Sequence, residues 1–288
     1  MRSRGELAAR EELAWIFREC YTFAVTHHLP SLATVFLLLC APAILAQGAP
    51  GELILTEDFE KTPAGEIPQG YTKSGAVSVV EDVAHGGKKS LRIEAATRGA
   101  RRITKQGAEI AALGGEHWGR LYFKVQLPVA TPVIPEGKTS GVIHSTLVSG
   151  KATSPLFNDP IEVRTLDTLL GMDGMVRFIY NVQPQKRPEF ATSGKNRVPF
   201  TGDWTLAEWH VDHATQTYEF FLNGGDVPDI AMRKGEGKFE GAEIPAAFES
   251  LSFGWNNYQP AEPGFVAWID DIALSKKRIG PTVAVPRK

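Results

Sequence analysis

The stretch RLYFKVQL, residues 120–127, alternates apolar and polar side chains without a break. Leu121, Phe123 and Val125 fall on one face of an extended chain, and Tyr122 and Lys124 fall on the other. Successive side chains of a β-strand point to opposite faces, whereas a helix repeats about every 3.6 residues. The stretch therefore predicts a strand with one face packed against a core.

Further short runs rich in β-branched and aromatic residues follow the same pattern, with Gly, Pro and Asn between them. They are SGVIHSTLVSG (140–150), IEVRTL (161–166), MVRFIYNVQ (175–183), AEWHVDH (207–213), TYEFFLNG (217–224), SLSFGW (250–255) and FVAWIDDIAL (265–274). No stretch after Gly51 keeps a helical period for three turns. Many short strands in one mature chain predict an all-β fold, a β-sandwich of jelly-roll type.

The composition excludes some classes of protein. The 288 residues include 43% hydrophobic and 22% charged residues, and the net charge is −2. This balance lacks the excess of positive charge that is typical of nucleic-acid-binding proteins. The one basic cluster, RGARRITK (98–105), is short and is typical of a solvated strand or loop face. The two cysteines, Cys20 and Cys40, both lie before the predicted mature chain. A mature chain without cysteine has no disulfide and must depend on its core.

The apolar run LATVFLLLCAPAILA, residues 32–46, has the length of a signal-peptide core and is short for a membrane span. Small residues follow it, so cleavage is expected between Ala46 and Ala49. The long segment before it indicates either a start codon assigned too far upstream or an uncleaved anchor. We expect residues 1–49 to be an N-terminal extension and signal peptide, 50–281 one domain and 282–288 a loose tail. The mature protein is then a secreted or periplasmic bacterial monomer without stable membrane association.

Three segments resemble a known family. The resemblance is to concanavalin-like jelly-roll carbohydrate-active domains. Their opening strand is similar to LTEDFEKTPAGEIPQGYT (55–72), a glycine loop to VAHGGKKSLRIE (83–94), and their closing strand to WIDDIALSKKRIG (268–280). With GDWTLAEWHVDHATQTYEFFLNG (202–224) and FGWNNYQ (253–259), the chain resembles the fungal cellulose-induced proteins of the glucuronan-lyase kind and their bacterial relatives. The resemblance covers most of the mature chain and is more specific for fold than for activity.

The resemblance implies a structural calcium ion that ties the first strand to the last. Calcium prefers carboxylate and carbonyl oxygens, and glycines in AHGGKKS (84–90) permit the backbone angles that turn carbonyls inward. The positions that match are Glu60, the carbonyl of Lys88 and one of Asp270 or Asp271, with Asp58 beside them. The alternative is that these charges only discourage pairing at sheet edges.

The same resemblance implies a groove that binds a uronic-acid polysaccharide and cleaves it by β-elimination. Such a lyase needs a donor to neutralise the substrate carboxylate, a base to remove the neighbouring proton and an acid to protonate the departing oxygen. The candidates for catalysis are His144 as base, Arg164 as hydrogen-bond donor to the substrate carboxylate, and Tyr180 or Tyr258 as acid. The candidates for substrate binding are Glu162, Arg177, Asn181, Gln183, Trp255 and Asn257.

Each candidate has a structural alternative. His144 lies in an apolar run, where an unpaired polar group is costly, so it has either a hydrogen-bonded structural role or a catalytic one. Glu162 and Arg164 form either an ion pair on one strand face or part of the substrate site. Trp255 and Tyr258 belong either to the core or to the groove.

Two functions therefore stay open: a polysaccharide lyase-like enzyme and a non-catalytic carbohydrate-binding jelly-roll module. No pair of glutamates with the spacing of a retaining glycosidase is present, nor any HExxH, GxSxG, GxGxxG or P-loop motif. The enzyme gains support if His144, Arg164 and a tyrosine converge on a shared groove, and the binding module gains support if His144 is buried with no access to that groove.

Overall fold

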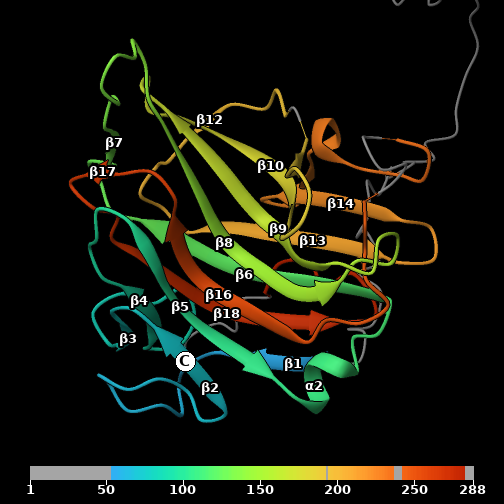
Figure 1. Cartoon of the computed structure of the whole chain (residues 1–288). Helices are drawn as coiled ribbons and strands as arrows, with labels where there is room; N and C mark the ends of the chain where they lie inside the picture. Colours follow the sequence, from blue (N-terminus) through green and yellow to red (C-terminus); the bar gives the residue numbers. More distant parts are fainter. Residues whose placement is uncertain (1–52, 193, 237–241, 283–288) are drawn as a thin grey trace, which may run out of the picture. The chain divides into compact units, whose positions relative to one another are not determined.

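The computed structural model describes residues 53–192, 194–236 and 242–282, and almost all regular structure in these ranges is β-strand. Two antiparallel sheets face each other (Figure 1), so the predicted all-β sandwich is confirmed. The predicted leader and the end of the predicted tail lie outside the described residues. Among the described helices, none has the length and apolar character needed to cross a membrane.

The first sheet contains the strand that RLYFKVQL predicts, β6. Its strands are, in spatial order, β15 (Gly225–Asp226), β14 (Thr217–Leu222), β13 (Thr205–Asp212), β6 (Glu116–Val125), β18 (Ala267–Ser275), β4 (Ser90–Ile93) and β3 (Val77–Val80), and β1 (Leu53–Glu57) also pairs with β18. The first described strand thus lies beside the last, and loop 84–90 contacts both Glu60, just after β1, and Asp270 of β18.

The second sheet carries the predicted site strands. Its order is β11 (Phe190–Ala191), β10 (Met175–Pro184), β9 (Pro160–Gly171), β8 (Val142–Thr153), β16 (Ser250–Asn257), β5 (Gly99–Gln106) and β2 (Tyr71–Ser74), with β12 (Val198–Pro199) also on β10. The short strands β7 (Thr131–Pro132) and β17 (Ala261–Glu262) pair separately, and the described helical elements are α2 (Ala108–Ala111) and a 3₁₀ turn, Pro228–Ile230.

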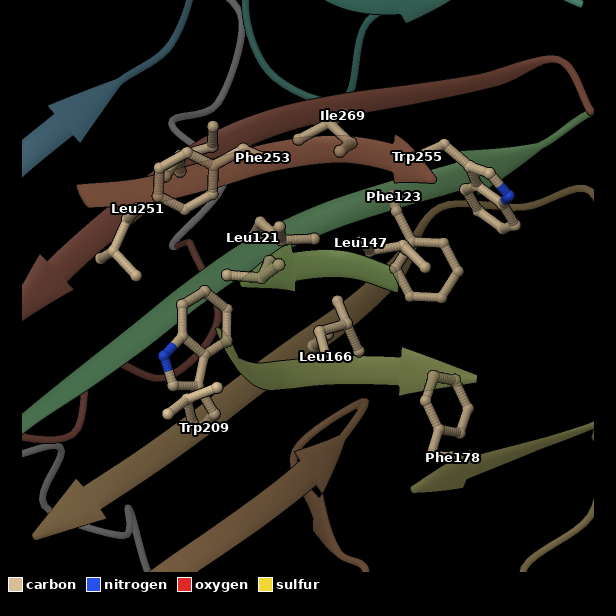
Figure 2. Packing of buried hydrophobic residues seen from close by; sticks show 14 of the residues in the cluster. Leu121, Phe123, Leu147, Leu166, Phe178, Trp209, Leu251, Phe253, Trp255 and Ile269 are labelled. Atoms are coloured by element: carbon tan, nitrogen blue, oxygen red, sulfur yellow. The ribbon is translucent and has the colours of Figure 1, made fainter. Parts of the chain in front are cut away.

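The core lies between the sheets, where inward side chains of both interdigitate (Figure 2). Phe123 of β6 and Phe178 of β10 meet edge to face across this layer, with ring centroids 6.4 Å apart. Trp209 of β13 is fully buried and stands over Gly119 of β6, where a Cβ atom would lie 2.1 Å from its ring. Only glycine fits beneath this indole, because real Cβ atoms do not approach other atoms so closely.

Three neighbouring strand pairs of the second sheet shift register at one level. The shifts fall between Thr146 and Ser149 in the β8–β9 pair, between Phe253 and Asn256 in β16–β8, and between Ile179 and Asn181 in β9–β10. An extra residue in a strand breaks the simple alternation of faces. We call this level the bulged row, and it decides which side chains reach the outer face.

Candidate functional site

The outer face of the second sheet, turned away from the core, carries a set of polar side chains around the bulged row. We call this set the His144 cluster. Its members are His144, Thr146 and Ser149 of β8, Glu162, Arg164 and Asp167 of β9, Asn181 of β10, Tyr258 after β16, Arg102 of β5 and Glu189 before β11.

At the centre of the cluster, His144 Nε2 lies 2.6 Å from Asp167 Oδ2. The Asp167 side chain is fully buried, whereas the His144 side chain keeps 13% of its surface exposed. Burial raises the pKa of Asp167, and the bond to His144 opposes that rise. When Asp167 is ionised it only accepts hydrogen bonds, so the imidazole proton lies on Nε2 and the lone pair on Nδ1.

A hydrogen-bonded chain continues from Asp167 to a tyrosine. Thr146 Oγ1 donates to Asp167 Oδ1 at 2.7 Å and lies 3.1 Å from Tyr258 Oη. Because the Thr146 proton is used, the phenol donates to Thr146. Burial first, and the charge of Glu162 second, raise the pKa of Tyr258, so the phenol keeps its proton at neutral pH.

Arg164 packs its guanidinium over the Tyr258 ring, 4.4 Å from the centroid, and the His144 ring lies 4.8 Å from the same ring. The predicted His, Arg and Tyr therefore converge. The Arg164 guanidinium also donates to Glu189 at 3.0 Å and to Asn181 at 3.3 Å. Since Arg164 is buried and Glu189 is exposed, the glutamate closes the outer side of this contact.

The predicted ion pair of Glu162 exists as part of a network. Glu162 Oε1 accepts from Ser149 at 2.7 Å and from Arg102 at 3.1 Å, and Glu162 Oε2 lies 3.7 Å from Arg164. Burial raises the pKa of Glu162, but the bond from Ser149 and the charges of Arg164 and Arg102 outweigh it and hold the pKa low. Two arginines of the cluster are thus balanced by two glutamates.

Three candidate groove residues face the core instead: the groove role predicted for Tyr180 and Asn257 is wrong, and of the two alternatives for Trp255 the core one holds. Tyr180 is fully buried, donates its hydroxyl to the Ala242 carbonyl and stacks on Tyr218 at 4.2 Å. Trp255 is a core residue (Figure 2), and Asn257 is fully buried, where it accepts a hydrogen bond from an arginine. Each is one residue away from a polar neighbour that does face outward, so alternation sends it inward.

Other predicted binding residues lie away from the centre. Gln183 donates to the carbonyl of Pro184 near the end of β10, and Arg177 is exposed near the other end of that strand. Asp167, Thr146 and Glu189 were not predicted. The signal for Asp167 was a lone carboxylate in the apolar run TLDTLL, residues 165–170, which pairs with the strand of His144.

Of the predicted calcium ligands, Glu60, Asp270 and Asp271 contact loop 84–90 through hydrogen bonds. Glu60 Oε1 accepts from the backbone N–H groups of Lys88 at 2.7 Å and Lys89 at 2.8 Å. Asp58 is exposed and accepts from the N–H of Glu60. The loop therefore turns amides, rather than the expected carbonyls, toward Glu60.

The closing strand meets the same loop. Asp270 is fully buried and accepts from the N–H groups of His85 at 2.8 Å and Gly86 at 3.1 Å, while Asp271 Oδ2 lies 2.7 Å from His85 Nδ1. Burial and the neighbouring Asp271 raise the pKa of Asp270 to about 7. As the described side chains stand, no group of three or more His, Cys, Asp or Glu is placed to hold a metal ion.

Comparison with solved structures identifies the architecture. The chain superposes on the cellulose-induced protein Cip1 with a TM-score of 0.51 and 18% identity, over 79% of this chain and 99% of that one. The chain has a concanavalin-like jelly-roll fold. The jelly roll also aligns with an endo-β-1,4-glucuronan lyase from the fungus Trichoderma reesei (TM-score 0.45, 11% identity, 78% of this chain and 96% of that one).

A xylan-binding domain of Paenibacillus barcinonensis Xyn10C aligns at a TM-score of 0.38 and 11% identity, over 82% of this chain and 99% of that domain. No family model matches the sequence, and no curated protein matches it. At these identities the comparisons establish the fold, and the function has to be argued from the His144 cluster.

Proposed function

We propose that this protein is an exported carbohydrate-active enzyme that cleaves uronic-acid-containing polysaccharides by β-elimination. The observation that carries the proposal is the chain His144–Asp167–Thr146–Tyr258, in which the Arg164 guanidinium covers the tyrosine ring. It combines a base, an acid and a cation within one partly exposed cluster. The jelly-roll neighbours, which include a glucuronan lyase and a xylan-binding domain, make a polysaccharide a reasonable substrate.

In the proposed reaction, His144 Nδ1 removes the proton from the carbon next to the uronate carboxylate. The electrons of that C–H bond form a carbon–carbon double bond, and the glycosidic C–O bond on the next carbon breaks. Tyr258 gives its proton to the departing oxygen. Asp167 stabilises the imidazolium that forms at His144, since a buried carboxylate interacts strongly with a neighbouring positive charge.

The hydrogen-bonded chain also gives a path for resetting the site. After the reaction His144 holds one proton too many and Tyr258 holds one too few. A proton moves from His144 Nε2 to Asp167, from Thr146 to Tyr258, and from Asp167 to Thr146, across contacts of 2.6, 3.1 and 2.7 Å. Tyr258 then has its proton back, and His144 is neutral with its remaining proton on Nδ1. Because 13% of the His144 side chain is exposed, exchange with water can return that proton to Nε2 and free Nδ1 for the next reaction.

Arg164 and Asn181 would neutralise the substrate carboxylate, because donors aimed at a carboxylate favour the charge that develops during proton removal. Both already hold the carboxylate of Glu189. Glu189 is exposed, so the substrate carboxylate would replace it at the same two donors.

The test is an ultraviolet assay with glucuronan, alginate and pectate, because β-elimination leaves a conjugated double bond that absorbs. We expect His144→Ala and Tyr258→Phe each to lower kcat by about 10²- to 10⁴-fold. Lys151→Ala is the matched control, since Lys151 lies exposed on β8 outside the cluster. Full activity in His144→Ala contradicts the proposal.

The second candidate is a non-catalytic carbohydrate-binding module. It is favoured by the balance of Arg102 and Arg164 against Glu162 and Glu189, which leaves a nearly neutral surface that would also suit a neutral sugar. Retention in an affinity gel together with a flat absorbance trace across all substrates would select this function.

We also propose a calcium ion at loop 84–90. What supports it is the pair of adjacent carboxylates of Asp270 and Asp271, whose repulsion a divalent cation would relieve. Glu60 and a carbonyl of the loop would supply further hard oxygens once the loop backbone turns. Calorimetric titration of the chelator-treated protein with Ca²⁺ tests this proposal.

A further inference from the structure

A cavity of about 350 Å³ lies at one end of the outer face that carries the His144 cluster. Its polar lining comes from Ser140, Asp173, Arg177 and Arg197, and its remaining walls come from two methionines and two glycines. One of these glycines, Gly171, ends β9 and pairs with the first residue of β8. The cavity therefore adjoins the strand ends nearest to His144.

Strand register places the cavity beside the proposed base. Leu169 of β9 pairs with His144 of β8 on one side and with Arg177 of β10 on the other. Directly paired residues share a face of the sheet, so His144 and Arg177 project from the same outer face. The backbones at His144 and Arg177 are two strand spacings apart, about 10 Å. Side chains as long as arginine and histidine can span this distance. A bound chain could touch both at once.

The charges of the cavity favour an anion. Arg177 is exposed, and within the described part of the chain no ion pair is found for it. Arg197 forms an ion pair with Asp173, so two guanidinium groups face one carboxylate and the lining has a net charge of +1. This differs from the His144 cluster, where each arginine has a glutamate partner. An exposed guanidinium without a partner is a ready donor for bidentate carboxylate binding.

The apolar part of the lining suits a sugar ring. Met172 is 44% exposed at the mouth of the cavity, and Met175 lines it as well. Sugar-binding sites combine apolar surface for the C–H face of the ring with a few polar groups that fix its orientation.

We infer that this cavity is a binding subsite for an acidic sugar, in which Arg177 holds the carboxylate of the uronate next to the one that reacts at His144. This inference rests on the proposed function. It adds that specificity for acidic chains comes from Arg177 and Arg197, because Arg164 serves the reacting sugar.

The experiment measures binding by calorimetry in the His144→Ala background, so that the ligand stays intact. The probes are a glucuronic-acid tetrasaccharide and cellotetraose, a neutral chain of equal length. Arg177→Ala should weaken binding of the acidic probe about tenfold or more, the loss of one charge-assisted contact, and Arg177→Lys should lose less. Binding of the neutral probe should stay as it was.

Arg233→Ala, which removes an exposed arginine next to the first sheet, controls for net charge and should change neither affinity. If the wild-type protein eliminates uronates, and Arg177→Ala in the His144→Ala background binds the acidic probe as tightly as His144→Ala alone, the subsite is refuted while the proposed function stands. If the wild-type protein produces no unsaturated product, the lyase function fails. If His144→Ala also binds the acidic and neutral probes equally, the subsite fails together with the lyase function.

Discussion

His117 gives a prediction whose magnitude follows from its surroundings. It is fully buried in β6, its Nε2 accepts from Trp209 Nε1 at 3.4 Å, and its ring meets Phe248 edge to face. Burial first, then the charges of His210 and Lys276, lower its pKa from 6.5 to about 3. The folded state therefore keeps this imidazole neutral at pH values where the unfolded chain protonates it.

The sign and size of the effect follow from linkage. Below pH 6.5 the unfolded state gains a proton that the folded state refuses, so stability falls as pH falls toward 3. The difference amounts to RT ln(1 + 10^(6.5 − pH)), which is about 2 kcal/mol at pH 5 and near zero at about pH 7.5. With an m-value of roughly 2 kcal/mol/M, the urea midpoint should move by about 1 M for this group alone.

The assay is urea unfolding of the wild type and His117→Gln at both pH values. Gln keeps an acceptor for Trp209 but does not titrate, so the variant should lose about 2 kcal/mol less than the wild type between about pH 7.5 and 5. Other titrating groups act equally on both proteins, and the difference isolates His117. Parallel pH profiles of the two proteins would refute the reasoning.

Three further predictions follow from the site, the core and the loop. Asp167→Asn removes the charge that orients His144. We expect kcat to fall about 10²- to 10⁴-fold while the far-ultraviolet circular dichroism stays unchanged. An unaltered kcat would argue against a catalytic role for the His144–Asp167 pair. Gly119→Ala forces a Cβ atom into the Trp209 ring and should cost about 1–3 kcal/mol in urea unfolding, whereas equal stability contradicts the packing. Calcium should raise the Tm of the wild type but not that of Asp271→Asn. Asparagine is chosen because it tolerates the positive φ of 50° at this position. If the wild type has the same Tm with calcium and with a chelator, no stabilising calcium ion is bound.

Alternation in the sequence predicted most of the fold because the sandwich buries one face of each strand. RLYFKVQL became part of β6, with Leu121 and Phe123 in the core. His144 and Arg164 share the outer face because they occupy polar positions in strands that are otherwise apolar. These features depend on local pattern, which a single sequence records.

The rest of the site depends on long-range pairing. Alternation from His144 places Val148 on the outer face, but Val148 is buried in the core and Ser149 takes the outer position. Alternation from Arg164 passes over Asp167 for the same reason, since the bulged row adds a residue to the strand. Glu189 lies beyond the end of β10, so only the folded chain shows its contact with Arg164.

Tyr180 shows a different limit. It stands between Ile179 and Asn181, and the period of two already assigns it to the face opposite Asn181. A site with Tyr180 as the acid and Asn181 as a donor would span two faces of one sheet. Residue type alone therefore misled where the pattern was informative.

The bulged row has a consequence for how this chain can change over generations. Thr146 and Ser149, like Arg164 and Asp167, share a face only because the strands carry extra residues between them. Deleting one residue there would rotate the remainder of that strand by half a period and exchange its buried and exposed sides. Insertions and deletions should therefore be rare at 146–149 of β8 and at 164–167 of β9, which have to change together. Alignments that place a gap in only one of these two strands will pair side chains from opposite faces.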